Sequence, residues 1–214
     1  MDERPVQVFI VDDEPEVTDA LVWLLDSIKM QSRAFSSAAP FLQAVRDAQG
    51  PVCAVLDMRM PEMSGLEIQQ ALLDEGFDVP MFFLSAHGDI PAAVNAIQRG
   101  AVDFLQKPFK PQEFLHAINR IHRLARERFS AGQARAQLQQ QIDKLSARER
   151  EVLGLLVKGY TSKEIAQKLS ISPKTVDVHR ANVIHKMGAS SAAQLQRMVH
   201  GVRGRSEGGE VPSV

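Results

Sequence analysis

The stretch PVCAVLDMRMPEMSG, from Pro51 to Gly65, decides the fold of the first part of this 214-residue chain. Its apolar run from Val52 to Leu56 contains small and β-branched side chains and is bounded by proline and glycine, which predicts a strand buried on both faces. The run ends on a single carboxylate, Asp57. Because the carboxyl ends of parallel strands open onto the ligand crevice of an α/β sheet, Asp57 is a candidate for chemistry rather than packing.

Apolar runs and helical patterns alternate on both sides of this stretch, through residues 1–120. The alternation predicts a doubly wound, flavodoxin-like parallel sheet of about five strands, which is an α/β fold. The other strands are expected at 6–11, 31–35, 81–84 and 102–105, and the helices at 15–29, 38–47, 66–74, 90–99 and from 112.

Polar side chains follow the strands at the sheet edge where Asp57 is expected: they are Asp12, Asp13, Asp57, Ser85 and Lys107. Three clustered carboxylates without a cation would raise one another's pKa, and so we expect a bound divalent ion. Oxygen ligands favour Mg²⁺, since no His or Cys lies at metal-site spacing. A lysine and a hydroxyl facing an Asp and Mg²⁺ are what phosphoryl transfer onto a carboxylate requires.

Each of these side chains has an ordinary structural explanation when it is taken alone. Asp12 and Asp13 could be acids favoured at a helix N-terminus. Asp57 could be a loop acid, Ser85 a turn residue and Lys107 a solvated charge. Their joint occurrence at successive strand ends favours the functional interpretation.

Four motifs in this half share one resemblance: VDDE (11–14), LDMRMPEMSG (56–65), LSAHGD (84–89) and DFLQKPF (103–109). In this order they resemble the receiver domain of two-component response regulators. The resemblance implies that Asp57 is the phosphoacceptor. It also implies that Asp12, Asp13, Asp57 and the backbone carbonyl of Arg59 hold Mg²⁺.

The same resemblance assigns roles to three residues on the later strands. Ser85 is the switch hydroxyl, Phe104 the switch aromatic and Lys107 the phosphate-pairing lysine, whose bond to Pro108 is expected to be cis. Phe104 could equally be an ordinary core residue. Ser85 stands where many receivers carry threonine, which keeps the hydroxyl but loses the methyl group.

The two halves of the chain carry opposite charge. Residues 1–120 hold 9 Lys and Arg against 18 Asp and Glu, and residues 121–214 hold 16 against 8, so the second half suits a polyanion.

The only cysteine, Cys53, lies in the strand run, which excludes an internal disulfide and fits a reducing cytoplasm. Without a signal pattern or an apolar run of ~18 residues, we expect a cytoplasmic protein with no membrane partner.

Residues 121–143 are polar, favourable to helix and free of proline, with Gly132 as the one obvious break. Leu138, Ile142 and Leu145 keep the spacing of one apolar helical stripe. A flexible, glutamine-rich tether is one interpretation and a helical linker is the other, and the spacing favours the helix.

Three helix-start signals follow in the second half. Ser146 to Glu149 and Thr161 to Glu164 are capping boxes, and Ser172 precedes a proline at the first helical position. They predict helices at 147–157, 162–169 and 173–187, and Ser191 can cap a fourth. The tight connection between the second and third of these helices is typical of a helix-turn-helix.

The third of these helices has a packed face and an outer face. Val176, Val183 and Met187 fall on the packed face, with Ile184 at its margin. The predicted DNA contacts, on the outer face and near helix starts, are Lys163, Lys174, Thr175, Asp177, Val178, Ala181, Asn182 and Lys186. Small apolar side chains such as Val178 suit thymine methyl groups, and the lysines suit phosphates, although a single surface valine is ordinary. Arg180 could reach a phosphate or pair internally.

The passage LSAREREVLGLLVKGYTSKEIAQKLSISPKTVDVHRANVIHKMGASS closely resembles the LuxR-type helix-turn-helix. With the receiver it resembles the FixJ/NarL family, nearest its FixJ-like branch, although Asp177 and Ala181 stand where some members carry basic residues. The expected domains are a receiver (1–120), a helical linker (121–143), a four-helix DNA-binding domain (144–203) and a disordered tail (204–214). The implied partners are a sensor histidine kinase, double-stranded DNA, a second copy after phosphorylation, and RNA polymerase.

Two other classes of protein share some of these features. A hydrolase with an aspartyl-phosphate intermediate would need a second Asp two residues after the first, where this chain has Arg59, and so we do not expect a turnover enzyme. A constitutive DNA-binding protein with a vestigial receiver is opposed by the intact set of acidic residues.

Overall fold

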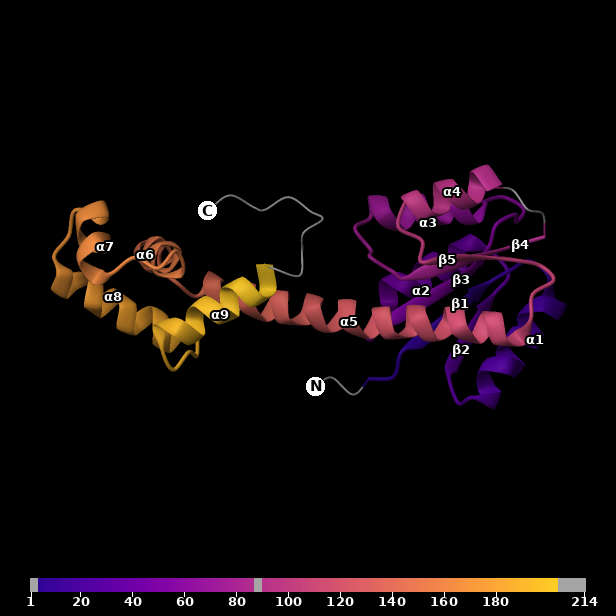
Figure 1. The fold of residues 1–214 in the computed structure, drawn as a ribbon, viewed down its shortest axis with the longest axis horizontal. Coiled ribbons are helices and arrows are strands. Elements are labelled where there is room, and N and C mark those ends of the chain that lie inside the picture. The colour runs from indigo at the N-terminus through magenta and orange to yellow at the C-terminus, as the bar shows by residue number, and fades with distance from the viewer. Residues whose placement is uncertain (1–3, 87–89, 204–214) are drawn as a thin grey trace. The chain divides into compact units, whose positions relative to one another are not determined.

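The computed structural model describes residues 4–86 and 90–203 of the chain (Figure 1). Residues 1–3, 87–89 and 204–214 are outside the described part, which includes the end of the LSAHGD motif and the tail expected to be disordered. The chain divides into two compact units, Met1–Ser130 and Ala131–Val214.

The first unit is built on a parallel sheet with the order β2-β1-β3-β4-β5, which confirms the predicted doubly wound fold. Its strands are β1 (Gln7–Val11), β2 (Gln31–Phe35), β3 (Val52–Asp57), β4 (Met81–Ser85) and β5 (Asp103–Gln106). The central strand β3 is buried from Cys53 onward, as its apolar run predicts. Because β3 lies between β1 and β4, its carboxyl end is flanked by the ends of both neighbours.

Helices cover both faces of this sheet. They are α1 (Pro15–Ser27), α2 (Ala38–Asp47), α3 (Gly65–Asp74), α4 (Ile90–Gln98) and α5 (Pro111–Asp143). Side chains of α2, α3 and α4 form one apolar core on the sheet, and side chains of α1 and α5 form the other. Fully buried phenylalanines anchor both layers, Phe41 the first and Phe114 the second, and burying such a side chain contributes about 1.5–3 kcal/mol.

Helix α5 continues through Gly132, where the sequence predicted a break. That prediction was wrong, because one glycine costs a helix only about 1 kcal/mol relative to alanine and its neighbours are strong helix formers. The helical interpretation of the linker is confirmed. Ile121 and Ala125 of α5 are buried in the first unit, whereas Leu138 is buried in the second.

The second unit contains α6 (Ala147–Val157), α7 (Ser162–Leu169), α8 (Pro173–Lys186) and α9 (Ala192–Arg203). Both capping boxes are formed, and the Ser172 hydroxyl accepts a hydrogen bond from the Thr175 backbone N–H, so the predicted helix starts are confirmed. None of the helices in the described ranges combines the length and apolarity that a membrane span needs.

The two predicted faces of α8 are also confirmed. Val176, Val183 and Met187 are fully buried in the core that α8 shares with α6 and α7, whereas the Val178 side chain is 56% exposed. Between α7 and α8 the chain turns at Ser170, which adopts a left-handed conformation with φ 52°. This compact turn sets α8 against α7 in the manner of a helix-turn-helix.

Candidate functional site

Two buried carboxylates meet at the carboxyl edge of the sheet. Asp57 is the last residue of β3, and Asp12 follows the end of β1. The register pairs Val11 with Leu56, so the two acids lie beside each other, and they are only 6% and 1% exposed. Two buried like charges need a counter-charge to remain ionised.

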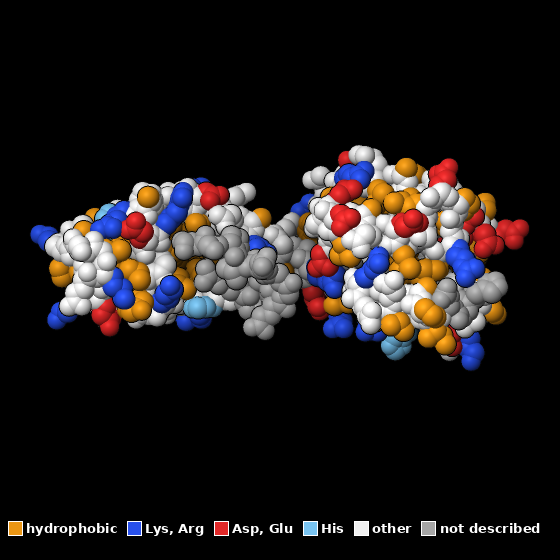
Figure 2. Space-filling view, turned by 90° about the horizontal axis from the view of Figure 1, so that it is seen from above, with side chains coloured by type: hydrophobic (Ala, Val, Ile, Leu, Met, Phe, Trp, Pro, Cys, Tyr) orange, Lys and Arg blue, Asp and Glu red, His pale blue; other side chains and the backbone are white. Residues whose placement is uncertain are grey.

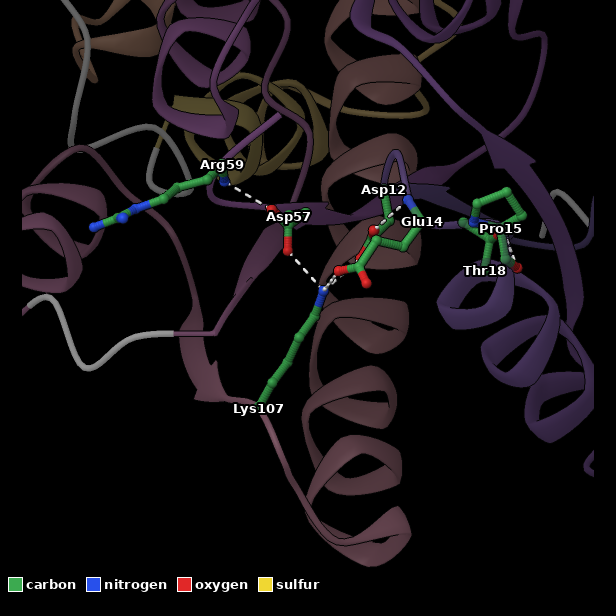
Figure 3. A network of polar contacts seen from close by, with 7 residues as sticks. All are labelled: Asp12, Glu14, Pro15, Thr18, Asp57, Arg59 and Lys107. Carbon is green, nitrogen blue, oxygen red and sulfur yellow. Dashed lines mark hydrogen bonds and ion pairs between the residues drawn. The ribbon is translucent and has the colours of Figure 1, made fainter. Parts of the chain in front are cut away.

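Lys107 supplies that counter-charge (Figure 3). Its Nζ atom lies 2.7 Å from Asp12 Oδ2 and 2.8 Å from Asp57 Oδ1, with Glu14 Oε1 at 3.6 Å. The Lys107 backbone N–H donates to the Ser85 carbonyl at 2.7 Å, which fixes the start of this loop to β4. The Lys107–Pro108 bond is cis, as expected.

Backbone amides hold the remaining oxygens of both acids. The Arg59 N–H donates to Asp57 Oδ2 at 2.7 Å, and the Glu14 N–H donates to Asp12 Oδ1 at 3.0 Å. Each carboxylate is therefore fixed by one amide and one shared ammonium group. Hydrogen bonds to an ionised acceptor are the stronger kind, so the carboxylates are well positioned before any ligand arrives.

Gly65 lets the loop after β3 fold back onto the strand. A Cβ atom at Gly65 would lie 2.4 Å from the Asp57 carbonyl oxygen and 2.9 Å from the Phe83 ring. No side chain fits there without displacing backbone, so the glycine of the MPEMSG segment is required by this close approach. The loop that carries Arg59 is thereby held over Asp57.

Burial and charge act in opposite directions on the two central groups. Burial raises the pKa of the Asp57 carboxyl above its ordinary value, and the Lys107 and Arg59 hydrogen bonds only partly offset this. Burial lowers the pKa of Lys107, but its bonds to Asp12 and Asp57 outweigh that effect and raise it. The ammonium group thus stays charged, and the Asp57 carboxylate depends on it.

The other predicted members of the site lie around this cluster. Ser85, the last residue of β4, is 1% exposed, and Asp13 is half-buried directly after Asp12. Phe104 on β5 is half-buried and packs against the core under α2, α3 and α4. Glu14, whose carboxylate faces Lys107, was not predicted as a site residue, although it stands in the VDDE motif.

No group of three or more His, Cys, Asp and Glu side chains within the described residues is arranged to hold a metal ion. The Lys107 ammonium stands between Asp12 and Asp57 instead. The donor set nevertheless suits a hard ion, because it consists of carboxylate oxygens at a buried edge. Asp12, Asp13 and Asp57 therefore fit Mg²⁺ by chemistry.

The predicted DNA-contact side chains of the second unit are exposed, and Figure 2 shows Lys and Arg side chains spread over the visible face of this unit. Lys186 is also engaged within the protein, since its Nζ lies 2.7 Å from Oε2 of the buried Glu149. The Arg180 guanidinium donates to the Ser162 hydroxyl, which is the internal pairing named as one alternative for this residue. Neither Glu149 nor Ser162 was singled out from the sequence for these contacts.

Two known families match the chain. Residues 8–119 match the response regulator receiver domain, and residues 143–199 match the bacterial regulatory proteins of the luxR family. The chain belongs to the response regulator family. This response regulator is therefore a two-component transcription factor with a LuxR-type DNA-binding domain, and not an enzyme that turns over a separate substrate.

Individual relatives resemble the response regulator over most of its length. It is 45% identical over 200 residues to the transcriptional regulatory protein TdiR of Thauera aromatica, covering 93% of this chain and 86% of that protein. It is 43% identical over 195 residues to FixJ of Rhizobium meliloti, covering 89% and 93%. The solved structure of the response regulator StyR matches with a TM-score of 0.79 at 41% identity, covering 92% of this chain and all of that one.

Proposed function

We propose that this response regulator is switched by phosphorylation of Asp57, transferred from a sensor histidine kinase with Mg²⁺ bound. The observation that carries the proposal is the Lys107 ammonium, which contacts both Asp12 and Asp57 at the carboxyl edge of the sheet. It places a fixed positive charge beside the acid that would receive a phosphoryl group. The receiver function is assigned to residues 1–120.

The residues around Asp57 have complementary tasks in this proposal. An Asp57 carboxylate oxygen attacks the phosphorus, and the bond from phosphorus to the kinase histidine breaks. Lys107 then pairs with a phosphoryl oxygen in place of the carboxylate oxygen that it now contacts. Asp12, Asp13, Asp57 and the Arg59 carbonyl would hold Mg²⁺, which would supply further positive charge beside the phosphoryl group.

Ser85 and Phe104 would couple phosphorylation of Asp57 to the surface of the first unit. Ser85 ends β4, the strand beside β3, and its hydroxyl can donate to a phosphoryl oxygen. Phe104 lies on the next strand, paired with Phe83 of β4, and packs partly beneath the helices. A shift of both toward the phosphoryl group would alter the surface formed by α4 and β5.

That surface is suited to a second copy of the chain. Ile90, Val94 and Ile97 lie on one stripe of α4 and are 73%, 49% and 46% exposed. Figure 2, which looks down on α3 and α4, shows apolar side chains gathered on this side of the first unit. An exposed apolar stripe of this kind marks a protein interface, and we assign it to the dimer formed after phosphorylation.

The output in this proposal is DNA binding by residues 144–203, with 121–143 as the linker. Helix α8 would lie in the major groove, where Val178 contacts a base edge while Lys163 and Lys174 contact phosphates. Two copies would bind a two-fold site, and RNA polymerase would be the next partner. We propose that the protein acts in the cytoplasm.

The test of phosphorylation is the intact mass of the full-length protein after incubation with acetyl phosphate and Mg²⁺. We expect the wild type to gain one phosphoryl group and Asp57→Asn to gain none. Asp26→Asn is the matched control, because Asp26 is exposed at the far end of α1 and should leave the gain unchanged. An undiminished gain in Asp57→Asn would overturn the assignment.

A further inference from the structure

An acidic residue lies on the outer face of the helix that is assigned to DNA. Asp177 is exposed on α8, next to Val178 and opposite the buried Val176 and Val183. A carboxylate in this position repels the phosphate backbone and so lowers non-specific affinity. A repulsion that is equal for every sequence does not discriminate between sequences, so a specificity role for Asp177 requires that its carboxylate contact one base better than another.

Asp177 is held in place by a serine from the neighbouring helix. The Ser162 hydroxyl donates to Asp177 Oδ1 at 2.8 Å, and the Arg180 guanidinium donates to the same hydroxyl. A hydroxyl has one proton and two lone pairs, so it can serve both partners at once. The chain of bonds from Arg180 through Ser162 to Asp177 links α7 to α8, and each bond polarises the next.

The Ser162 hydroxyl is not needed to cap its helix. Thr161 is the N-cap of α7 and forms a complete capping box with Glu164, and Ser162 is the next residue. α8 has its own cap at Ser172. The Ser162 hydroxyl therefore serves to bond Asp177 and Arg180, and not to cap a helix.

The hydrogen bond occupies one carboxylate oxygen of Asp177. In the described part of the chain Oδ2 has no hydrogen-bond partner, so it is left to accept from a group outside the protein. In the major groove the exocyclic amino group of cytosine is a donor that suits a carboxylate, whereas the guanine edge presents only acceptors. A fixed acceptor would thus favour cytosine and disfavour guanine at one position.

We propose that Ser162 is a positioning residue that holds Asp177 as a fixed acceptor for a cytosine amino group, and that this pair sets the base preference at one position of each half-site. The proposal rests on the proposed function, because it requires α8 in the major groove. It assigns Asp177 to specificity and not to affinity.

The experiment is selection of DNA from a random library by the full-length protein treated with acetyl phosphate, followed by sequencing. We expect the wild type to prefer cytosine at one position of each half-site. Ser162→Ala should lower that preference by about three- to tenfold, and Asp177→Asn should abolish or change it. Ser162→Thr keeps the hydroxyl and is the matched control, and it should retain the wild-type preference.

Non-specific binding gives a second measurement that a purely structural role would not affect. Asp177→Asn should raise affinity for unrelated DNA by roughly two- to fivefold, because it removes a negative charge from the outer face of α8. If Asp177→Asn kept the wild-type base preference, the specificity role of Asp177 would be overturned. If Ser162→Ala kept it, the positioning role of Ser162 would be overturned. Absence of any selected sequence with the wild type would instead overturn the placement of α8 in the groove.

Discussion

At the scale of single residues, the acidic cluster at the carboxyl edge of the sheet depends on a glycine that lets the loop after β3 approach the strand. Gly65→Ala would place a Cβ atom 2.4 Å from the Asp57 carbonyl oxygen. We expect a loss of about 1–3 kcal/mol in the free energy of unfolding of the first unit, because backbone must move to relieve the overlap. Amide hydrogen exchange in the buried strand β3, which reports opening of the first unit, measures it.

The matched control is the same substitution at a glycine with open surroundings. Gly132 lies inside α5, and a Cβ atom there would meet nothing within 4 Å. Gly132→Ala should stabilise the helix by about 0.5–1 kcal/mol. If both substitutions had the same effect, the close approach at Gly65 would not be the cause.

The residues of the acidic cluster were largely predictable, because each follows a strand whose apolar pattern is clear. Asp12, Asp57 and Lys107 come together from distant parts of the sequence by topology alone. The sequence could not show that one ammonium contacts both acids, since that depends on side-chain rotamers and on where the β5 loop ends. Glu14 was missed for the same reason.

At the scale of elements, a buried amide joins α3 to the end of α4. Gln69 is 2% exposed, and its Nε2 donates to the carbonyls of Ala96 and Arg99 at 3.2 and 3.3 Å. Gln69→Leu removes both donors, at a cost of about 1–3 kcal/mol. We expect amide hydrogen exchange at Ala101, whose N–H donates to the Ala96 carbonyl, to accelerate about tenfold or more.

Gln70 provides the control for this contact. It is exposed on the same helix and accepts a hydrogen bond from the Arg99 guanidinium, so Gln70→Ala should change exchange at Ala101 little. Equal exchange rates in Gln69→Leu and the wild type would show that the amide does not hold the end of α4.

A second element-scale contact gives the DNA-binding domain a pH dependence. The hydrogen bond from Lys186, followed by the Ser146 backbone N–H, holds the pKa of Glu149 below its ordinary value near 4.5. A carboxyl with a lower pKa in the folded chain stabilises the fold only while it is ionised. This stabilisation is complete above the ordinary pKa and is lost as the pH falls through the folded pKa.

Glu149→Gln should therefore flatten the acid dependence of the second unit's stability and cost about 2 kcal/mol at neutral pH. Unfolding can be followed through Tyr160, the only tyrosine, in a Trp23→Phe background. Glu151→Gln is the control, because the Glu151 carboxylate is half-exposed and pairs with Arg148 at the surface. A pH profile unchanged by Glu149→Gln would contradict the role of the contact between Lys186 and the buried Glu149.

Helix starts in the second unit were predictable to the residue, because Ser146, Thr161 and Ser172 satisfy local donors that the sequence itself identifies. The continuation of α5 through Gly132 was not predictable, since the helix propensity of one unfavourable residue is outweighed by that of its many favourable neighbours. The contacts of Gln69 and Ser162 join different helices, and no local pattern reveals them.

At the scale of the whole molecule, the charge of the chain is divided between two functions. The acidic half contains the Asp57 cluster that we assign to phosphoryl transfer, and the basic half contains the helix that we assign to DNA binding. Control by phosphorylation requires that an event at Asp57 changes the DNA affinity of the second domain. Neither half alone tests that requirement.

The most direct measurement is the DNA affinity of the full-length protein, with and without acetyl phosphate and Mg²⁺, on a sequence obtained by selection. We predict that the phosphodonor raises the affinity of the wild type and of the Asp26→Asn control by about tenfold, which corresponds to about 1.4 kcal/mol. The phosphodonor should leave the affinity of Asp57→Asn unchanged. An equal increase in Asp57→Asn would contradict the account.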